Sequence, residues 1–539
     1  MPVFHNLPGW IDGRALEYPV NIIMYDKLKK KYPEIMLGVD HIPETVDFIN
    51  LHDDLICNQV TQSLQPAKPL MGVEIQAGSR HHKTRIYAHE LELFYKACIV
   101  HGLKGINFYM FSQGINPPRQ GALGPVFYWQ TPLNVKASQT DLYDVIRQLG
   151  KFVQTHQQHL LSAKKDADIA VGIYRPYYYT EFTIPAFGQR KLDAGRLGLD
   201  YDPQQIRDSV LFDGLLRSLQ LLNYDYDVKD IKSARLSELS RYKQLWVVSL
   251  DYMDEKTQQK LASYVESGGH LIMMPTLATK DMDLNKCTLL KEHFDIRLLD
   301  KIRPEPPKID LLGIKDFSCL PLINIYDAKG QEVVARTEDG RCCGISKKIK
   351  KGKLTLIGTA FSYELAEHLS AYKALIKTDK IEPAVKTTNE DIICGRLKAD
   401  KCDFLYIFNY HRRQIKTSIS LKEKQKKEHG ALDSIRLSMP PTYGLITPLN
   451  LRLSGALKLI YTTSDLLSFK SSTKKVLFEL KGHPDLAGKL VLKSPKPPRK
   501  ITLNNEPINS YSYNQQNRLS ISYTHPEGPS KGFELEIKF

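Results

Sequence analysis

The sequence predicts a multidomain protein of α/β and all-β parts: a partial (β/α)8 barrel, a doubly wound α/β domain, and one or two C-terminal β-sandwiches. Three observations predict this fold class. Short apolar strands alternate with helices over residues 1–160, a separate strand and helix series fills 161–380, and strands of period two fill 381–539. A chain of 539 residues is also too long for one hydrophobic core, which favours about three domains.

The first domain, residues 1–160, has the pattern of four strand and helix units. Apolar runs predict strands within 2–10, 34–44, 71–78 and 105–111, and helical periodicity predicts helices at 22–32, 46–64, 87–101 and 140–159. A whole (β/α) barrel needs eight such units and about 250 residues. The first domain is therefore expected to be half of a barrel.

The second domain, residues 161–380, repeats the alternation with different spacing. Strands are expected at 169–174, 224–228, 245–250, 270–275 and 354–361, with helices at 204–222 and 254–267. The second of these helices stops at Gly268 and Gly269, where glycine tolerates the left-handed backbone of a helix end. With a β-rich insertion before its last strand, this series predicts a small doubly wound sheet.

The third region, residues 381–539, changes to alternating apolar and polar residues separated by turn clusters. The clearest runs are CDFLYIFNY, KLVLK, RLSISY and FELEIKF. Period-two runs of this length are typical of antiparallel strands with one buried face. One or two β-sandwich domains are expected here.

Charge and composition exclude several classes of function. The net charge is +15, but lysine and arginine alternate with acidic residues along the chain, so a basic solvated surface is favoured over nucleic-acid binding. No apolar run is long enough to cross a membrane or resembles a signal peptide, and the eight cysteines form no C-x-x-C pair. We expect a cytoplasmic protein with no membrane partner, metal or cofactor.

The candidate chemistry lies at the strand ends of the first domain. Glu74 closes the apolar run MGVE, and Gln76 and Arg80 follow it. The next predicted strand ends in Tyr109. Barrel enzymes carry their catalytic groups at the carboxyl ends of strands, and carboxylates, amides and aromatic faces suit a hydroxyl-rich ligand. Glu74 is the predicted catalytic residue, and Gln76, Arg80 and Tyr109 are predicted to bind a sugar.

The segments GVEIQAG, GINFYMFSQGIN, GPVFYWQTPLN and LYDVIRQLGKFV together resemble the C-terminal half of the catalytic barrel of β-galactosidases of glycoside hydrolase families 35 and 42. The resemblance implies Glu74 as the nucleophile, with Tyr109 and Trp129 as walls of the sugar subsite. It also implies that the doubly wound domain is the flavodoxin-like trimerisation domain of family 42. Asn6 and His41, near the ends of the first two strands, complete the predicted substrate-binding set.

One departure from this family pattern is large. A retaining glycosidase needs two carboxyl groups, one as nucleophile and one as acid/base. In the family the acid/base is the Glu of an Asn-Glu pair on the fourth strand, whereas Asn389-Glu390 and Asn505-Glu506 lie in the β region. The missing half points to a fragment of a longer gene, a separate chain, or a decayed barrel. Asp40 or Glu44 at the preceding strand end is a less favoured replacement.

The expected function is a β-galactosidase-like glycoside hydrolase acting by double displacement through Glu74. The expected partners are a β-galactoside or related oligosaccharide, and either further copies of the chain, such as a trimer, or a missing barrel half. We expect the chain alone to be inactive on β-galactosides. The alternative is a non-catalytic carbohydrate-binding or assembly subunit on the same scaffold.

Overall fold

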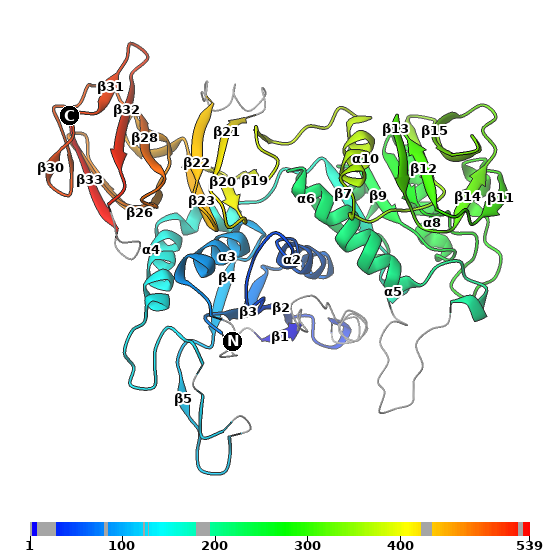
Figure 1. Cartoon of the computed structure of the whole chain (residues 1–539), viewed down its shortest axis with the longest axis horizontal. Coiled ribbons are helices and arrows are strands. Elements are labelled where there is room, and N and C mark those ends of the chain that lie inside the picture. The colour runs from blue at the N-terminus through cyan, green and yellow to red at the C-terminus, as the bar shows by residue number, and fades with distance from the viewer. Residues whose placement is uncertain are drawn as a thin grey trace.

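The computed structural model describes residues 3–7, 29–79, 85–121, 124–127, 129–178, 194–421, 434–526 and 532–539. Its parts lie in a row along the long axis, from the C-terminal β-sheets through a central α/β part to a second α/β part (Figure 1). The segment around β5 projects away from the central part in the same view. None of the helices in the described ranges is long and apolar enough to cross a membrane.

The central part is built on a parallel sheet of four strands in the order β1-β2-β3-β4. The strands are β1 (Phe4–Leu7), β2 (Met36–His41), β3 (Met71–Gln76) and β4 (Gly105–Tyr109). The helices are α2 (Asp53–Leu64), α3 (Ala88–Val100) and α4 (Asp141–Ser162), and a hairpin of β5 (Gly114–Ile115) and β6 (Val126–Phe127) follows β4. All four predicted strands are present.

Helix α2 starts later in the chain than predicted. Helix α2 begins at Asp53 rather than near residue 46, because Asp47 and Asn50 accept hydrogen bonds from the backbone N–H groups of Ile49 and Asp47. Such side-chain acceptors favour turns over helix. The acidic residues that suit a helix start, Asp53 and Asp54, come only afterwards. Most of the helix predicted at 22–32 lies outside the described residues.

The second α/β part contains a sheet of nine strands in the order β13-β12-β15-β16-β17-β10-β9-β7-β8. Its parallel half consists of β7 (Ile169–Ile173), β8 (Tyr226–Asp230), β9 (Gln244–Val248), β10 (His270–Met274) and β17 (Gly352–Ile357). The other strands of this sheet are β12 (Lys308–Leu311), β13 (Ile314–Ser318), β15 (Glu332–Thr337) and β16 (Cys342–Ile349). A separate two-stranded sheet pairs β11 (Leu298–Ile302) with β14 (Ile323–Tyr326). The parallel strands follow the order 2-1-3-4-5, which is a doubly wound arrangement.

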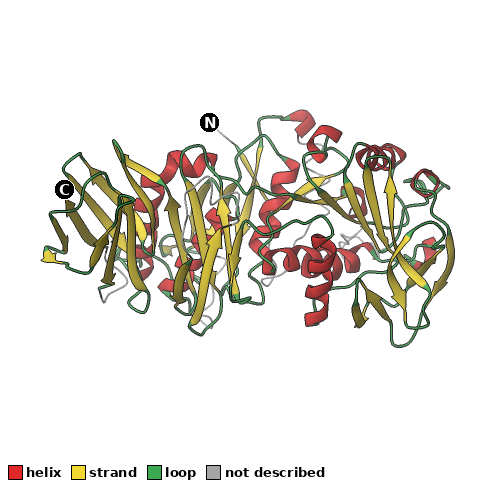
Figure 2. Ribbon diagram, turned by 90° about the horizontal axis from the view of Figure 1, so that it is seen from above, coloured by secondary structure: helices red, strands yellow, loops and turns green. Residues whose placement is uncertain are grey.

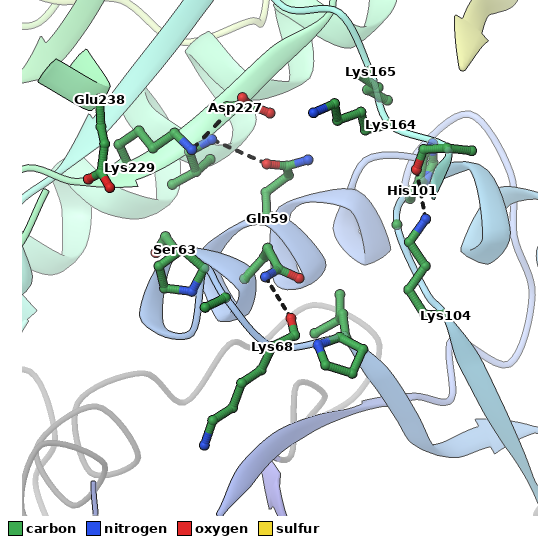
Figure 3. A pocket seen from close by; sticks show the side chains of 18 of the residues that line it. Gln59, Ser63, Lys68, His101, Lys104, Lys164, Lys165, Asp227, Lys229 and Glu238 are labelled. Atoms are coloured by element: carbon green, nitrogen blue, oxygen red, sulfur yellow. Dashed lines mark hydrogen bonds and ion pairs between the residues drawn. The ribbon is translucent and has the colours of Figure 1, made fainter. Parts of the chain in front are cut away.

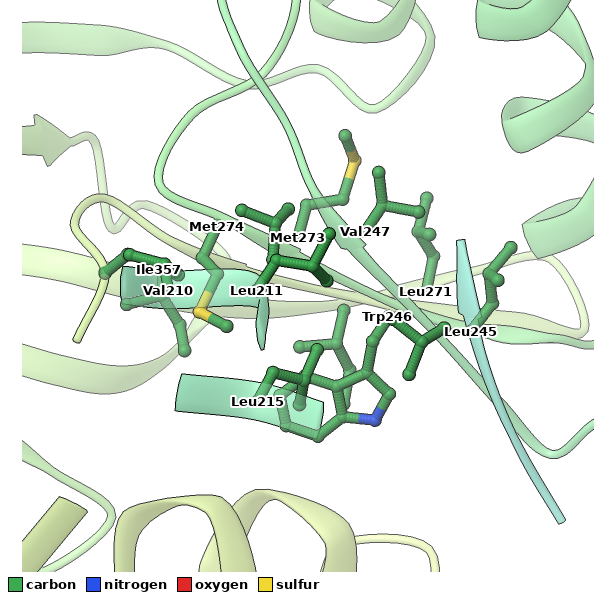
Figure 4. Close-up of a cluster of buried hydrophobic side chains, with 14 of the residues drawn as sticks. Val210, Leu211, Leu215, Leu245, Trp246, Val247, Leu271, Met273, Met274 and Ile357 are labelled. Atoms are coloured by element: carbon green, nitrogen blue, oxygen red, sulfur yellow. The ribbon is translucent and has the colours of Figure 1, made fainter. Parts of the chain in front are cut away.

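Helices cover both faces of this sheet. They are α5 (Pro203–Gln205), η4 (Ile206–Leu216), α6 (Arg217–Leu221), α7 (Leu236–Leu239), α8 (Glu255–Glu266), α9 (Leu289–His293) and α10 (Ala366–Lys377), with short 3-10 turns at η1 (Arg175–Tyr178) and η3 (Gly195–Leu197). Trp246 is fully buried at the centre of the core, beside Leu215 of η4 (Figure 4). The predicted helix 204–222 is continuous but widens into a π-helix over η4.

The C-terminal region is antiparallel, as predicted. Its sheets are β18-β21-β22, β19-β20-β23, β24-β25-β28-β32-β31 and β26-β27-β33-β29-β30, and they lie side by side when the molecule is seen from above (Figure 2). The strands of the first two sheets are β18 (Val385–Thr387), β19 (Ile392–Leu397), β20 (Asp403–Asn409), β21 (Ile415–Leu421), β22 (Ile435–Met439) and β23 (Tyr443–Leu449). The strands of the other two are β24 (Leu451–Ser454), β25 (Leu457–Thr462), β26 (Asp465–Ser471), β27 (Lys475–Lys481), β28 (Ala487–Lys493), β29 (Lys500–Leu503), β30 (Glu506–Pro507), β31 (Tyr511–Tyr513), β32 (Arg518–Thr524) and β33 (Phe533–Lys538).

A buried ionic network joins helix α3 to these β-sheets. The ammonium of Lys96 lies 2.7 Å from Oε1 of Glu92 and 2.6 Å from Oδ2 of Asp465, and it donates to the carbonyl of Gly444 at 2.7 Å. Lys481 of β27 also pairs with Glu92. Because buried charges are costly unless they are paired and hydrogen-bonded, this network fixes the central part against the C-terminal sheets.

Candidate active site

The four parallel strands of the central sheet end at one edge, where most of the predicted site residues lie. Asn6, Glu74 and Tyr109 belong to β1, β3 and β4, within the last three residues of each strand. Asp40 and His41 end β2. Carboxyl ends of parallel strands collect their side chains at a common edge, so the site is assembled from adjacent strand ends.

A β-bulge at Val73 sets the direction of Glu74. The strand register runs Val39 opposite Gly72 and then Asp40 opposite Glu74, so that Val73 is an extra residue in β3. The same irregularity appears towards β4, and the side-chain amide of Asn107 donates to the carbonyl of Val73 at 2.8 Å. A bulge re-aims the side chains that follow it. Glu74 is thereby placed directly across from Asp40.

Asn6 connects the two carboxyl groups. Its Nδ2 donates to Oδ2 of Asp40 at 3.0 Å and lies 3.4 Å from Oε1 of Glu74. Oδ1 of Asp40 and Oδ1 of Asn6 are buried and have no hydrogen-bond partner among the described residues. Buried polar atoms in proteins are nearly always hydrogen-bonded. These two acceptors therefore mark a place where a proton or a ligand hydroxyl group would be held.

The environment of Asp40 favours its protonated form. Burial raises the pKa of Asp40 to about 7, the neighbouring Glu74 carboxylate raises it too, and the hydrogen bond from Asn6 opposes the change. Two carboxyl groups at close quarters resist being ionised together. At neutral pH Asp40 is therefore partly protonated, which lets it donate a hydrogen bond as well as accept one.

The Gln76 side chain holds the loop after β2 by two hydrogen bonds to the backbone of Glu44. Its Oε1 accepts from the backbone N–H of Glu44 at 2.8 Å, and its Nε2 donates to the carbonyl of Glu44 at 2.9 Å. The Glu44 backbone is left-handed, with φ of 61°, and Ser79 donates to its Oε2 at 3.0 Å. Gln76 thus supports the rim of the site, and its predicted contact with substrate stays a prediction.

Tyr109 and Trp129 form an aromatic pair beside this edge. Their ring centroids are 6.0 Å apart and their planes are inclined by 77°, an edge-to-face contact. The Trp129 carbonyl accepts from Nε2 of Gln113 at 2.7 Å, which fixes the loop that carries the indole. Both side chains are only partly buried, and aromatic rings at such a position suit contact with a sugar ring.

His41 and Arg80 are not brought into this group. Side chains alternate along a strand, so His41 turns with Val39 towards the helices while Asp40 turns away from them. His41 is fully buried, with its Nε2 2.7 Å from Oδ1 of Asn58 in α2. In this structure it cannot touch a ligand at the Glu74 edge. Arg80 lies outside the described residues.

A cavity of about 700 Å³ lies at the opposite, amino ends of β3 and β4 (Figure 3). Lys68, Lys104, Lys164, Asp227 and Lys229 are among its lining residues. Burial lowers the pKa of Lys104 to about 8, and its ammonium donates to the carbonyls at the end of α4. This cavity holds none of the predicted site residues and lies away from the carboxyl pair. No group of three potential metal ligands occurs within the described ranges.

The pairing of Asp40 with Glu74 is the feature that the sequence did not reveal. Asp40 ends its apolar run as Glu74 ends the next one, and alternation with the buried Leu37 and Val39 assigns it to the face opposite His41. The alternation of buried and polar residues could therefore have assigned Asp40 to the same edge as Glu74. The bulge at Val73, which decides the register, has no marker in the sequence.

Comparison with known proteins agrees with the glycosidase resemblance at a general level. Residues 198–332, in the second α/β part, match the family model described as GLMA-like, second domain. The chain is 41% identical over 430 residues to a β-1,2-glucosyltransferase of Ignavibacterium album, covering 79% of this chain and 60% of that protein. It is 24% identical over 421 residues to an exo-β-D-glucosaminidase of Pyrococcus horikoshii, covering 74% of this chain and 48% of that one. The chain thus spans about half or slightly more of the length of these relatives.

Solved structures show the same fold. A catalytic mutant of Gan42B, a family 42 β-galactosidase of G. stearothermophilus, has a TM-score of 0.64 at 15% identity and covers 83% of this chain and 64% of its own. A β-galactosidase of Bacillus circulans sp. alkalophilus has a TM-score of 0.58 at 14% identity, with 78% of this chain and 65% of its own covered. The chain therefore shares its fold with family 42 enzymes, and its relatives are named as glycoside-processing enzymes.

Proposed function

We propose that the chain carries the nucleophile half of a retaining enzyme that processes β-glucosides. The observation that carries the proposal is the position of Glu74, at the carboxyl edge of a parallel sheet, directed by a bulge and placed opposite Asp40. Aromatic walls at Tyr109 and Trp129 support a sugar ligand. The 41% identical glucosyltransferase supports glucose over galactose as the transferred sugar.

We further propose that the four-stranded sheet is half of a (β/α)8 barrel, within domains at 1–160, 161–380 and 381–539. Parallel sheets are normally covered on both faces. Here all five residues of β4 are at least partly exposed, and Asp40 and Glu74 lie on the face opposite the helices. The remaining strands, and with them an acid/base carboxyl group, would come from beyond this sheet, as in families 35 and 42. We also propose that copies of this chain associate into oligomers through the doubly wound part.

In the proposed mechanism, an oxygen of Glu74 attacks the anomeric carbon and forms a glycosyl ester, while the bond to the leaving group breaks. The acid/base protonates the leaving oxygen. The acid/base, now deprotonated, takes the proton of a sugar hydroxyl or water, whose oxygen attacks the anomeric carbon and releases the Glu74 carboxylate. Asp40 and Asn6 hold the hydrogen-bond network that orients the Glu74 carboxylate.

Leaving groups of different acidity test this function, because an acidic phenol departs without protonation while an alcohol or sugar does not. The purified chain is expected to release 2,4-dinitrophenolate from its β-glucoside faster than from its β-galactoside. Release of 4-nitrophenol should be much slower. Glu74→Gln should reduce every rate to that of buffer. Equal rates for wild type and Glu74→Gln would favour the alternative, a non-catalytic carbohydrate-binding or assembly subunit.

A further inference from the structure

A second candidate binding site lies among the C-terminal sheets, far along the chain from Glu74. A groove of about 1030 Å³ runs between the loop that joins β19 to β20 and the outer face of the sheet β24-β25-β28-β32-β31. Its basic lining residues are Lys398, Lys401, Lys458, Lys489, Lys493 and Arg518. Its acidic lining residues are Asp400 and Asp403. The groove is thus strongly positive.

Three of these cations occupy directly opposed positions on adjacent strands. Lys493 of β28 is the register partner of Lys458 on β25 and of Arg518 on β32. Neighbouring strands are about 4.8 Å apart, and like charges directly opposite one another destabilise a sheet. Lys489 lies on the same face of β28 as Lys493 and is exposed like it, although Val491 between them is buried. Repulsion among these cations destabilises the sheet unless an anionic group binds between them.

The protein itself supplies little negative charge here. Within the described residues, the ammonium groups of Lys401, Lys458, Lys489 and Lys493 make no ion pair with a carboxylate. Asp403 is 2.9 Å from the guanidinium of Arg396, which takes up its charge. These four lysine side chains are exposed, and their ammonium groups are open to solvent in the groove.

The rest of the lining favours a carbohydrate over a nucleic acid. The lining also contains hydroxyl and amide side chains, namely Asn450, Ser512, Asn514, Gln516 and Ser520. These groups hydrogen-bond to sugar hydroxyls. No aromatic ring occurs among the described lining residues, whereas single-stranded nucleic acids are generally held by stacking on aromatic rings.

We propose that this groove binds an acidic polysaccharide, with the carboxylates of successive sugar residues lying along Lys458, Lys489 and Lys493. The proposal does not depend on catalysis at Glu74. Binding in this groove would anchor the protein to a charged glycan.

Affinity electrophoresis of the full chain in polygalacturonate tests the proposal, with neutral dextran and single-stranded oligothymidylate as comparison probes. We expect retardation by polygalacturonate that weakens as salt rises. The double variant Lys458→Gln/Lys493→Gln should lower the affinity by at least about tenfold. The matched double variant Lys470→Gln/Lys500→Gln removes two exposed lysines from the other five-stranded sheet and should change it by less than about twofold.

Three outcomes would overturn the proposal: no retardation by polygalacturonate in low salt, equal losses in the two double variants, or tighter binding of oligothymidylate than of polygalacturonate. The melting temperature of each variant shows whether a loss of affinity comes from misfolding. Because the lysine row is repulsive, Lys458→Gln/Lys493→Gln should melt no lower than wild type in the absence of polysaccharide.

Discussion

Asp40 and Glu74 face each other across the β2 and β3 strands, with the amide of Asn6 bonded to Asp40 at 3.0 Å and lying 3.4 Å from Glu74. This relationship makes the carboxyl edge of the central sheet a coupled pair rather than a single acid. Burial, together with the Glu74 carboxylate, raises the pKa of Asp40, and a perturbed carboxyl group beside a second one gives the strongest physical reason to assign chemistry to this edge.

The pKa of Asp40 predicts a pH-dependent gain in stability for Asp40→Asn. Burial and Glu74 raise the pKa of Asp40 to about 7 from 3.8, so its ionisation opposes folding. The stability that it contributes is complete below pH 3.8 and is lost as pH rises through about 7. Asp40→Asn should therefore melt like wild type at pH 4 and about 2–4 °C higher at pH 8. Asp283→Asn, at an exposed position, serves as control, and an equal shift at both pH values would contradict the account.

Gly78 should tolerate no side chain, because a Cβ there would lie 1.8 Å from the carbonyl oxygen of Gln130. Gly78→Ala must displace the loop that carries Trp129, at a cost of about 1–3 kcal/mol. We expect a lower melting temperature and a changed tryptophan emission, since Trp129 is partly exposed while Trp246 is fully buried. Gly114→Ala, where no atom lies within 4 Å of the added Cβ, should leave both signals unchanged.

Lys96 is predicted to stabilise the interface between the central part and the C-terminal sheets. Lys96→Met removes a cation from between Glu92 and Asp465 and leaves the buried Asp465 without it, which should cost about 3–5 kcal/mol. Chemical denaturation measures this loss. Lys151→Met breaks a half-exposed pair with Glu479 between α4 and β27 and should cost less than about 1 kcal/mol. Equal costs for the two variants would show that burial of the Lys96 network contributes nothing.

Hydrophobic periodicity predicted most of the strands and helices, because apolar residues recur wherever an element faces the core. The run IAVGIY became β7, and the helix ending at Gly268 became α8, with the glycine at φ of 117°. The start of α2 and the π-helix η4 were not predicted, since local turn bonds and packing override helical propensity.

The candidate site was predicted in part. Asn6 and Glu74 lie together at the expected edge, and Tyr109 contacts Trp129. His41 was expected at the edge, yet strand alternation turns it into the core, and Gln76 is used to hold Glu44. The pairing with Asp40 depends on a bulge, and a register shift of one residue depends on tertiary contacts that no local pattern records.

The most direct test of the central claim is covalent trapping of Glu74. In 2,4-dinitrophenyl 2-deoxy-2-fluoro-β-glucoside, the fluorine slows both steps and the good leaving group restores the first, so a glycosyl ester should accumulate without an acid/base. Intact mass and peptide mapping should show one fluoroglucosyl group on Glu74 in wild type and in Asp40→Asn, and none in Glu74→Gln. A label on any other residue, or an unlabelled wild-type chain that still binds the reagent, would contradict Glu74 as the nucleophile.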